Sequence, residues 1–92
     1  MSCSKYPKEL LGKWHNETVK KETLIFYKDG SLEAIEDKET EAGNYTLIDK
    51  NTIKVGVGGL TASKIATYSF DKEGFLVLTE PNGNAEKFKK ID

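Results

Sequence analysis

Catalysis by a nucleophile and a general base would depend on very few residues of this chain. His15 is the only histidine and Cys3 the only thiol among the 92 residues, and a cysteine beside a histidine can form a reactive thiolate. Cys3 stands close to the chain terminus, where nothing holds its side chain against a strand residue. His15 reads more simply as a polar residue that alternates with Trp14. The sequence therefore predicts no catalytic residues and no enzyme activity.

Two other segments contain residue types that bind phosphate or metal ions. Residues 56–64 place glycines ahead of Lys64, but they lack the Gly-Lys-Ser/Thr ending of a phosphate-binding loop, and no helix is predicted after them. The tract from Glu33 to Glu41 carries five carboxylates against one lysine, yet it lacks the Asp and Gly spacing of a calcium-binding loop. We interpret both as hairpin connections, and we expect no cofactor and no metal site.

The charged residues argue against nucleic acid as a partner. The formal net charge is -1 at pH 7, and all 14 basic residues are lysines. Arginine is the side chain that forks onto phosphate and guanine, so neither the charge nor the residue types favour nucleic-acid binding. With 37% apolar and 32% charged residues, the chain can form one core under a solvated surface. A single soluble domain without internal disulfides is expected.

Turn signals recur about every ten residues and separate runs that are alternating, β-branched or aromatic. We predict eight strands, at residues 11–16, 22–27, 31–36, 43–48, 52–57, 64–70, 75–79 and 85–91. Pro7 can begin a short N-terminal helical turn. Every connection can be a hairpin, and pairing the first strand with the last would remove the exposed edges. The expected fold is all-β, a small up-and-down meander barrel of eight short antiparallel strands.

Apolar residues at every second position define the side of each strand that faces the interior. The predicted inward residues are Leu24, Phe26, Leu32, Ala34, Tyr45, Leu47, Ile53, Val55, Val57, Ala66, Tyr68, Phe70, Leu76, Leu78 and Phe88. Eight strands enclose either a filled core or one small ligand. The aromatic rings in this set favour a filled interior, and the alternative is a small apolar pocket at an open end.

A Gly-x-Trp motif, formed by Gly12 and Trp14, stands at the first predicted strand. It resembles the opening motif of lipocalin-like barrels. That resemblance implies that Gly12 lets the backbone pass tightly and that Trp14 closes one end of the barrel. The order of motifs through residues 10–91 is similar to that in the small lipocalin-like domains of bacterial lipoproteins. This resemblance predicts the architecture much better than it predicts an activity. We expect a leader or tether at residues 1–9 and a single barrel domain at residues 10–92.

The first residues, Met1-Ser2-Cys3-Ser4-Lys5, resemble the start of a mature bacterial lipoprotein with Met-Ser in place of the leader. In that family the cysteine is acylated, so the resemblance implies a lipid anchor at Cys3. The alternative is an ordinary free cysteine in a cytoplasmic protein. The barrel likeness favours a non-catalytic binding or interaction domain at the bacterial cell envelope. A cytosolic small-ligand carrier or regulatory module is the alternative function.

The connections of a meander alternate between the two barrel ends. Short polar turns crowd one end, at residues 28–30, 49–51 and 71–74. The longer connections fall at the other end, at residues 37–42, 58–63 and 81–84. Because binding residues concentrate on such loops when a rigid scaffold presents them, we expect a ligand or partner to dock at this second end.

The expected contact surface consists of Leu60 and Thr61, with Tyr45 or Tyr68 beneath. The predicted partner is a small apolar ligand or a further protein. We expect the chain to be a monomer that meets a membrane only through a lipid on Cys3.

Overall fold

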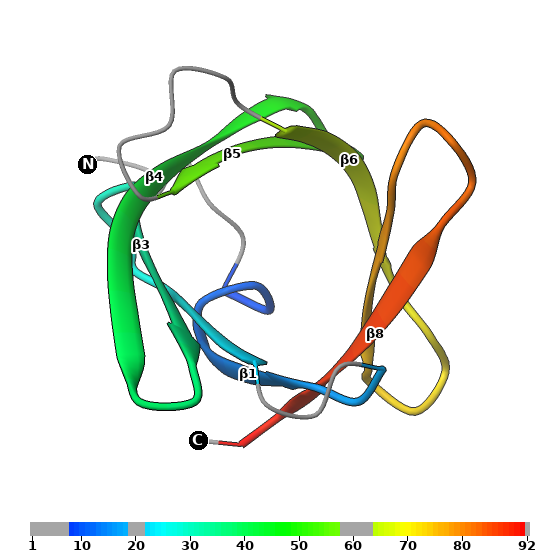
Figure 1. Ribbon diagram of the computed structural model, residues 1–92. Coiled ribbons are helices and arrows are strands. Elements are labelled where there is room, and N and C mark those ends of the chain that lie inside the picture. Colours follow the sequence, from blue (N-terminus) through cyan, green and yellow to red (C-terminus); the bar gives the residue numbers. More distant parts are fainter. Residues whose placement is uncertain (1–7, 19–21, 58–63, 92) are drawn as a thin grey trace.

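The computed structural model describes residues 8–18, 22–57 and 64–91. Their strands are β1 (Gly12–Asn16), β2 (Glu22–Phe26), β3 (Ser31–Glu36), β4 (Glu39–Asp49), β5 (Thr52–Val57), β6 (Lys64–Phe70), β7 (Leu76–Thr79) and β8 (Ala85–Lys90). Each strand pairs antiparallel with the next, and β1 also pairs with β8, so the sheet closes into a barrel. Figure 1 shows this ring of strands along its axis. The predicted eight-stranded meander barrel is confirmed.

β4 begins four residues earlier than the sequence predicted. Glu36 pairs with Glu39 and Glu33 pairs with Ala42, so only Asp37 and a lysine remain between β3 and β4. Asp37 has a φ of 56°, a left-handed conformation that aspartate tolerates better than most residues in a tight hairpin. The long acidic connection predicted at residues 37–42 is therefore wrong. Its polar composition was interpreted as a loop, although a strand near the end of a barrel can carry polar side chains on both faces.

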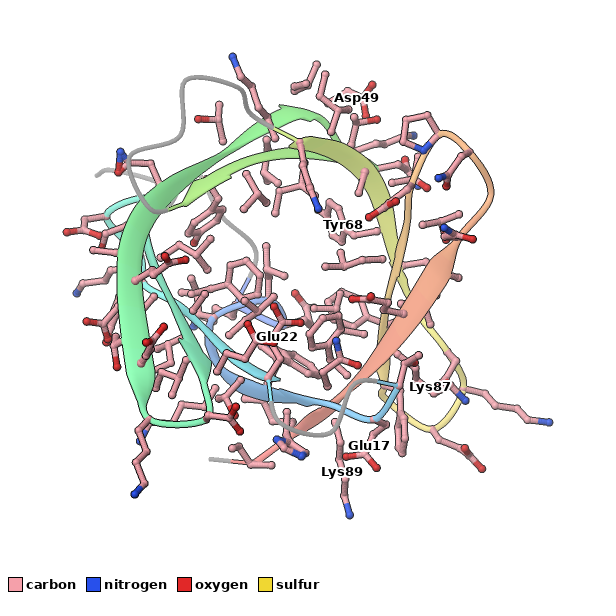
Figure 2. The ribbon with its side chains drawn as sticks, viewed as in Figure 1. Glu17, Glu22, Asp49, Tyr68, Lys87 and Lys89 are labelled. Carbon is pink, nitrogen blue, oxygen red and sulfur yellow. The ribbon has the colours of Figure 1, made fainter. Side chains whose placement is uncertain are left out.

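Most of the predicted inward residues form the core, whereas the prediction for Phe70 was wrong. Ten buried side chains make one cluster, namely Leu10, Trp14, Leu24, Phe26, Leu32, Tyr45, Ile53, Tyr68, Leu76 and Phe88. Ala34, Leu47, Val55, Ala66 and Leu78 pack against them. Phe70 stays 36% exposed and touches the ring of Trp14 with centroids 5.9 Å apart. Figure 2 shows Tyr68 and Glu22 inside the ring of strands and Lys89 outside it. The side chain of Val57 lies outside the described part of the structure.

A single turn before β1 closes one end of the barrel, which we name the closed end. Leu10 in this turn is fully buried and Trp14 is 2% exposed. The Trp14 Nε1–H donates a hydrogen bond of 2.8 Å to the carbonyl oxygen of Leu10. Lys90 lies over the indole ring, with Nζ 5.0 Å from the centroid, and donates to the Leu11 carbonyl at 2.7 Å. These contacts fix the turn across the interior, where Figure 1 shows it in blue.

Gly12 is required at the point where this turn enters β1. Its φ is +118°, and an added Cβ would lie 2.8 Å from Cε of Lys90. Backbone of this conformation disfavours every L side chain, whereas the end of the flexible Lys90 side chain could move away from an added Cβ. The positive φ is therefore the reason for glycine at this position.

Aspartates cap the three described turns at the closed end. Asp29 accepts hydrogen bonds from both the hydroxyl and the backbone N–H of Ser31, at 2.6 and 2.9 Å, and the hydroxyl contact is the main reason that its pKa is lowered. Asp49 and Asp71 accept bonds mainly from backbone N–H groups of their own turns, which also lower their pKa values. The ionised carboxylates therefore stabilise these turns.

Candidate functional site

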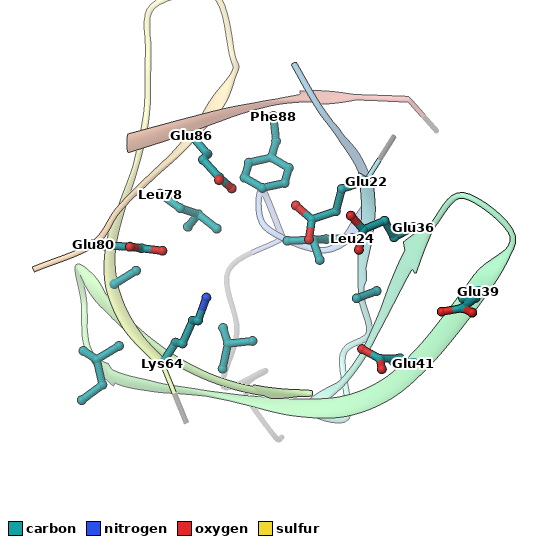
Figure 3. A pocket seen from close by; sticks show the side chains of 14 residues that line it. Glu22, Leu24, Glu36, Glu39, Glu41, Lys64, Leu78, Glu80, Glu86 and Phe88 are labelled. Carbon is teal, nitrogen blue, oxygen red and sulfur yellow. The ribbon is translucent and has the colours of Figure 1, made fainter. Parts of the chain in front are cut away.

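A cavity of about 320 Å³ occupies the interior at the end opposite to Trp14, which we name the cavity end. Strands β2 to β8 all contribute to its wall, as Figure 3 shows from close by. The volume lies near the lower limit of ~300 to 1,000 Å³ for small-molecule sites. It is about twice the ~150 Å³ of a cavity that binds benzene. The docking surface was predicted at this same end of the barrel.

The inner wall of the cavity is apolar, and we call this part the apolar floor. It consists of Leu24, Ala34, Val55, Ala66, Leu78 and Phe88. Alanine on β3 and on β6 leaves space where larger side chains would meet across the barrel. Toward the closed end, inward positions carry Phe26, Tyr45 and Tyr68 instead. The closed end is therefore filled, as we expected for the whole interior. The cavity end has instead the apolar pocket that was the alternative.

Glutamates surround the outer part of the cavity, and we call them the acidic rim. They are Glu22, Glu36, Glu39, Glu41, Glu80 and Glu86. All except Glu80, which directly follows β7, lie on strands and continue the two-residue alternation of the inward residues, so the pleat directs them to the same face. Glu22 precedes Leu24 by two positions, for example, and Glu86 precedes Phe88 by two. These residues were not predicted because charged side chains were expected to face solvent.

Three members of the acidic rim stand directly opposite one another on adjacent strands. Glu22 of β2 pairs with Glu36 of β3, and Glu36 pairs with Glu39 of β4. Like charges in directly opposed cross-strand positions are destabilising. Lys64 is the one basic residue among the described residues that line the cavity, and Figure 3 shows its ammonium group reaching in from β6, on the side away from Glu22 and Glu36.

Asn16 at the end of β1 holds two rim carboxylates in place. It is fully buried, and its Nδ2 donates hydrogen bonds to Oε1 of Glu22 at 2.8 Å and to Oε1 of Glu86 at 3.0 Å. Its Oδ1 accepts from the backbone N–H of Thr18 at 2.7 Å, which fixes the amide orientation. A neutral amide restrains both carboxylates without adding a compensating charge. This arrangement could not be predicted from the sequence, since it joins residues from three strands.

The two tyrosines predicted at the contact surface lie in the core instead of lining the cavity. Tyr45 is 2% exposed, its hydroxyl donates to the Tyr27 carbonyl at 2.7 Å, and its ring meets Phe26 edge to face at 5.0 Å. Tyr68 is buried as well, and burial is the main cause of its raised pKa. Both tyrosines belong to the filled half of the barrel, below the apolar floor.

The remaining predicted residues separate into two groups. Gly12 and Trp14 meet at the closed end, as described above. Leu60, Thr61 and Cys3 lie outside the described residues.

Few other side chains in the described ranges are positioned for catalysis or for metal binding. His15 is half-buried, and its Nδ1 lies 3.3 Å from Oγ1 of Thr23. No group of three or more His, Cys, Asp or Glu residues in the part of the chain that the structure describes could hold a metal ion. No helix within residues 8–18, 22–57 and 64–91 is long and apolar enough to span a membrane.

Comparisons of this chain with protein-family models, with curated proteins and with solved structures found no match. The geometry of the cavity is thus the basis for the functional conclusion.

Proposed function

We propose that this protein is a non-catalytic, lipocalin-like binding domain that holds a small ligand in the cavity of its barrel. The observation that carries the proposal is the division of the interior into two halves. Aromatic side chains and the N-terminal turn fill the closed end, whereas the cavity end retains about 320 Å³ above an apolar floor. A rigid, closed sheet around a partly empty interior is suited to binding one small molecule.

The small residues of the floor support this proposal. Protein interiors are normally packed as densely as organic crystals, and an alanine in place of a larger core residue typically forgoes about 2 kcal/mol or more of stability. Ala34 and Ala66 both line the cavity and both remain only half-buried. Alanine at these two positions is explained, in spite of the lost stability, if the cavity must stay open for a ligand.

Titration with 1-octanol, followed by amide chemical shifts, tests the proposal. We expect the largest shifts at floor residues such as Leu24, Ala66 and Phe88. Ala66→Phe should abolish them, because the ring occupies the cavity. Ala42→Phe is the matched control, since Ala42 lies exposed on β4 and is not a lining residue. The proposal is wrong if octanol leaves the floor residues unshifted, or if both variants respond as the parent does.

The proposal also places the domain at a bacterial cell envelope, anchored through a lipid on Cys3. The resemblance of the first five residues to a mature lipoprotein, and of the motif order to lipocalin-like lipoprotein domains, supports it. Mass spectrometry of the protein purified from its native host should find an acylated Cys3. An unmodified Cys3 there would remove the anchor and leave a cytosolic ligand carrier as the function.

A further inference from the structure

We infer that the ligand is an organic cation, with an ammonium group held by the acidic rim and an apolar body on the floor. This inference rests on the proposed function, because it assigns a chemical class to the occupant of the same cavity. A body of roughly a dozen non-hydrogen atoms suits a volume twice that of a benzene-binding cavity.

The distribution of charge is the first observation behind this inference. The whole chain is close to neutral, with 15 acidic and 14 basic residues. Among the described residues that line the cavity, however, six are glutamates and one is a lysine. The charge of these described lining residues is therefore mainly negative, which attracts cations and repels anions.

The register of the strands is the second observation. Glu22, Glu36 and Glu39 follow one another across three strands in directly opposed positions, with Cβ atoms expected about 4.5 to 5.5 Å apart. Repulsion between these carboxylates lowers the stability of the ligand-free protein. An ammonium group near these carboxylates reverses the unfavourable interaction, so the ligand that best complements the site carries positive charge.

The hydrogen bonds of Asn16 are the third observation. They restrain Glu22 and Glu86 from two different strands, so these carboxylates need little reorganisation when a cation binds. Carboxylate acceptors restrained in this way are a preorganised site for a charge-assisted hydrogen bond.

The spacing of the carboxylates favours an organic cation over a metal ion. Within the described ranges, no three of them converge closely enough to hold an ion together, although six surround the cavity. The apolar floor directly below, with Leu78 and Phe88, offers nothing to a hydrated metal but can bury an alkyl or aromatic body. Figure 3 shows the carboxylates of Glu22 and Glu86 on either side of the ring of Phe88, so one small molecule can reach both the rim and the floor.

Three probes with the same alkyl chain test the inference by calorimetry: octylammonium, 1-octanol and octanoate. We expect octylammonium to bind at least about tenfold more tightly than octanol and octanoate to bind most weakly, with the preference shrinking as salt increases. Glu22→Gln and Glu36→Gln should each weaken octylammonium binding by about fivefold and leave octanol unchanged. The glutamine at position 22 can still accept the bond from Asn16, so charge alone changes.

Glu73→Gln is the matched control, because Glu73 is exposed in a turn at the closed end and should affect no probe. Lys64→Gln should strengthen octylammonium binding and not weaken it. If octanol reaches the floor but octylammonium binds no more tightly, the inference is wrong and the proposed function stands. If neither probe binds, both are wrong. Binding of Ca²⁺ that excludes octylammonium from the rim would also overturn the inference.

Discussion

Replacement of Trp14 by alanine should remove the plug of the closed end and cost a large part of the stability of the fold. The indole is 2% exposed, donates a 2.8 Å hydrogen bond to the Leu10 carbonyl, and lies under the Lys90 ammonium group. Trp14→Ala would therefore leave a void and also release the N-terminal turn that covers it. The two effects act on the same end of the barrel and should appear together.

The expected loss is about 3 to 5 kcal/mol, the usual cost of truncating a buried tryptophan. Small domains are stable by only ~5 to 15 kcal/mol in total. Since each kcal/mol shifts the melting temperature of a domain of this size by roughly 4 to 8 °C, a loss of 4 kcal/mol corresponds to about 15 to 30 °C. Trp14→Phe keeps an aromatic ring but leaves the Leu10 carbonyl without its donor, which should cost about 1 to 3 kcal/mol.

Thermal and urea denaturation of the parent and both variants measure these differences. The order of stability should be parent, then Trp14→Phe, then Trp14→Ala. If Trp14→Ala melts within a degree or two of the parent, Trp14 does not plug the barrel. If instead Trp14→Phe is as unstable as Trp14→Ala, the ring volume contributes little and the account of the closed end is wrong.

Three further predictions concern charge and backbone conformation. Glu36→Gln should raise the free energy of unfolding of the ligand-free protein by roughly 0.5 kcal/mol, because it removes the repulsion of Glu36 with Glu22 and with Glu39; a loss of stability in urea denaturation would contradict the strand register. The folded-state pKa values of Asp29, Asp49 and Asp71 are lowered, so their stabilisation is complete above the ordinary value of about 3.9 and is lost as pH falls through the lowered values. The melting temperature should therefore decrease when the pH is lowered below about 4. The triple Asp→Asn variant should show a smaller decrease over this pH range, because amides still cap the turns but do not titrate. Gly12→Ala should cost about 1 to 3 kcal/mol through its positive φ; an unchanged midpoint in urea would show that the backbone relaxes there without cost.

The strands could be predicted from the sequence because turn signals and two-residue alternation agree along most of the chain. Leu24 with Phe26, and Leu76 with Leu78, show an apolar residue at every second position, and all four face the interior. The prediction failed at residues 39–42, where a polar segment belongs to a strand. Composition cannot distinguish a polar strand end from a loop, since backbone pairing decides between them.

The acidic rim could have been predicted in part. Extending the alternation by one step from Leu24 or from Phe88 reaches Glu22 and Glu86, and both line the cavity. This pattern was not used because charged side chains were expected to point outward. Near the open end of a barrel, however, an inward side chain can still contact water. The role of Asn16 could not have been predicted, because it depends on the registers in which β1 pairs with β2 and with β8.

Intermolecular nuclear Overhauser contacts between octylammonium and the protein test whether an organic cation binds in the cavity with its ammonium group at the acidic rim. We expect contacts from the terminal methyl group to Leu78 and Phe88 on the floor, and from the methylene beside nitrogen to Glu22 and Glu86 on the rim. Contacts confined to exposed apolar residues of the outer surface, such as Ile48, would contradict it, as would a ligand bound with its ammonium group toward the closed end.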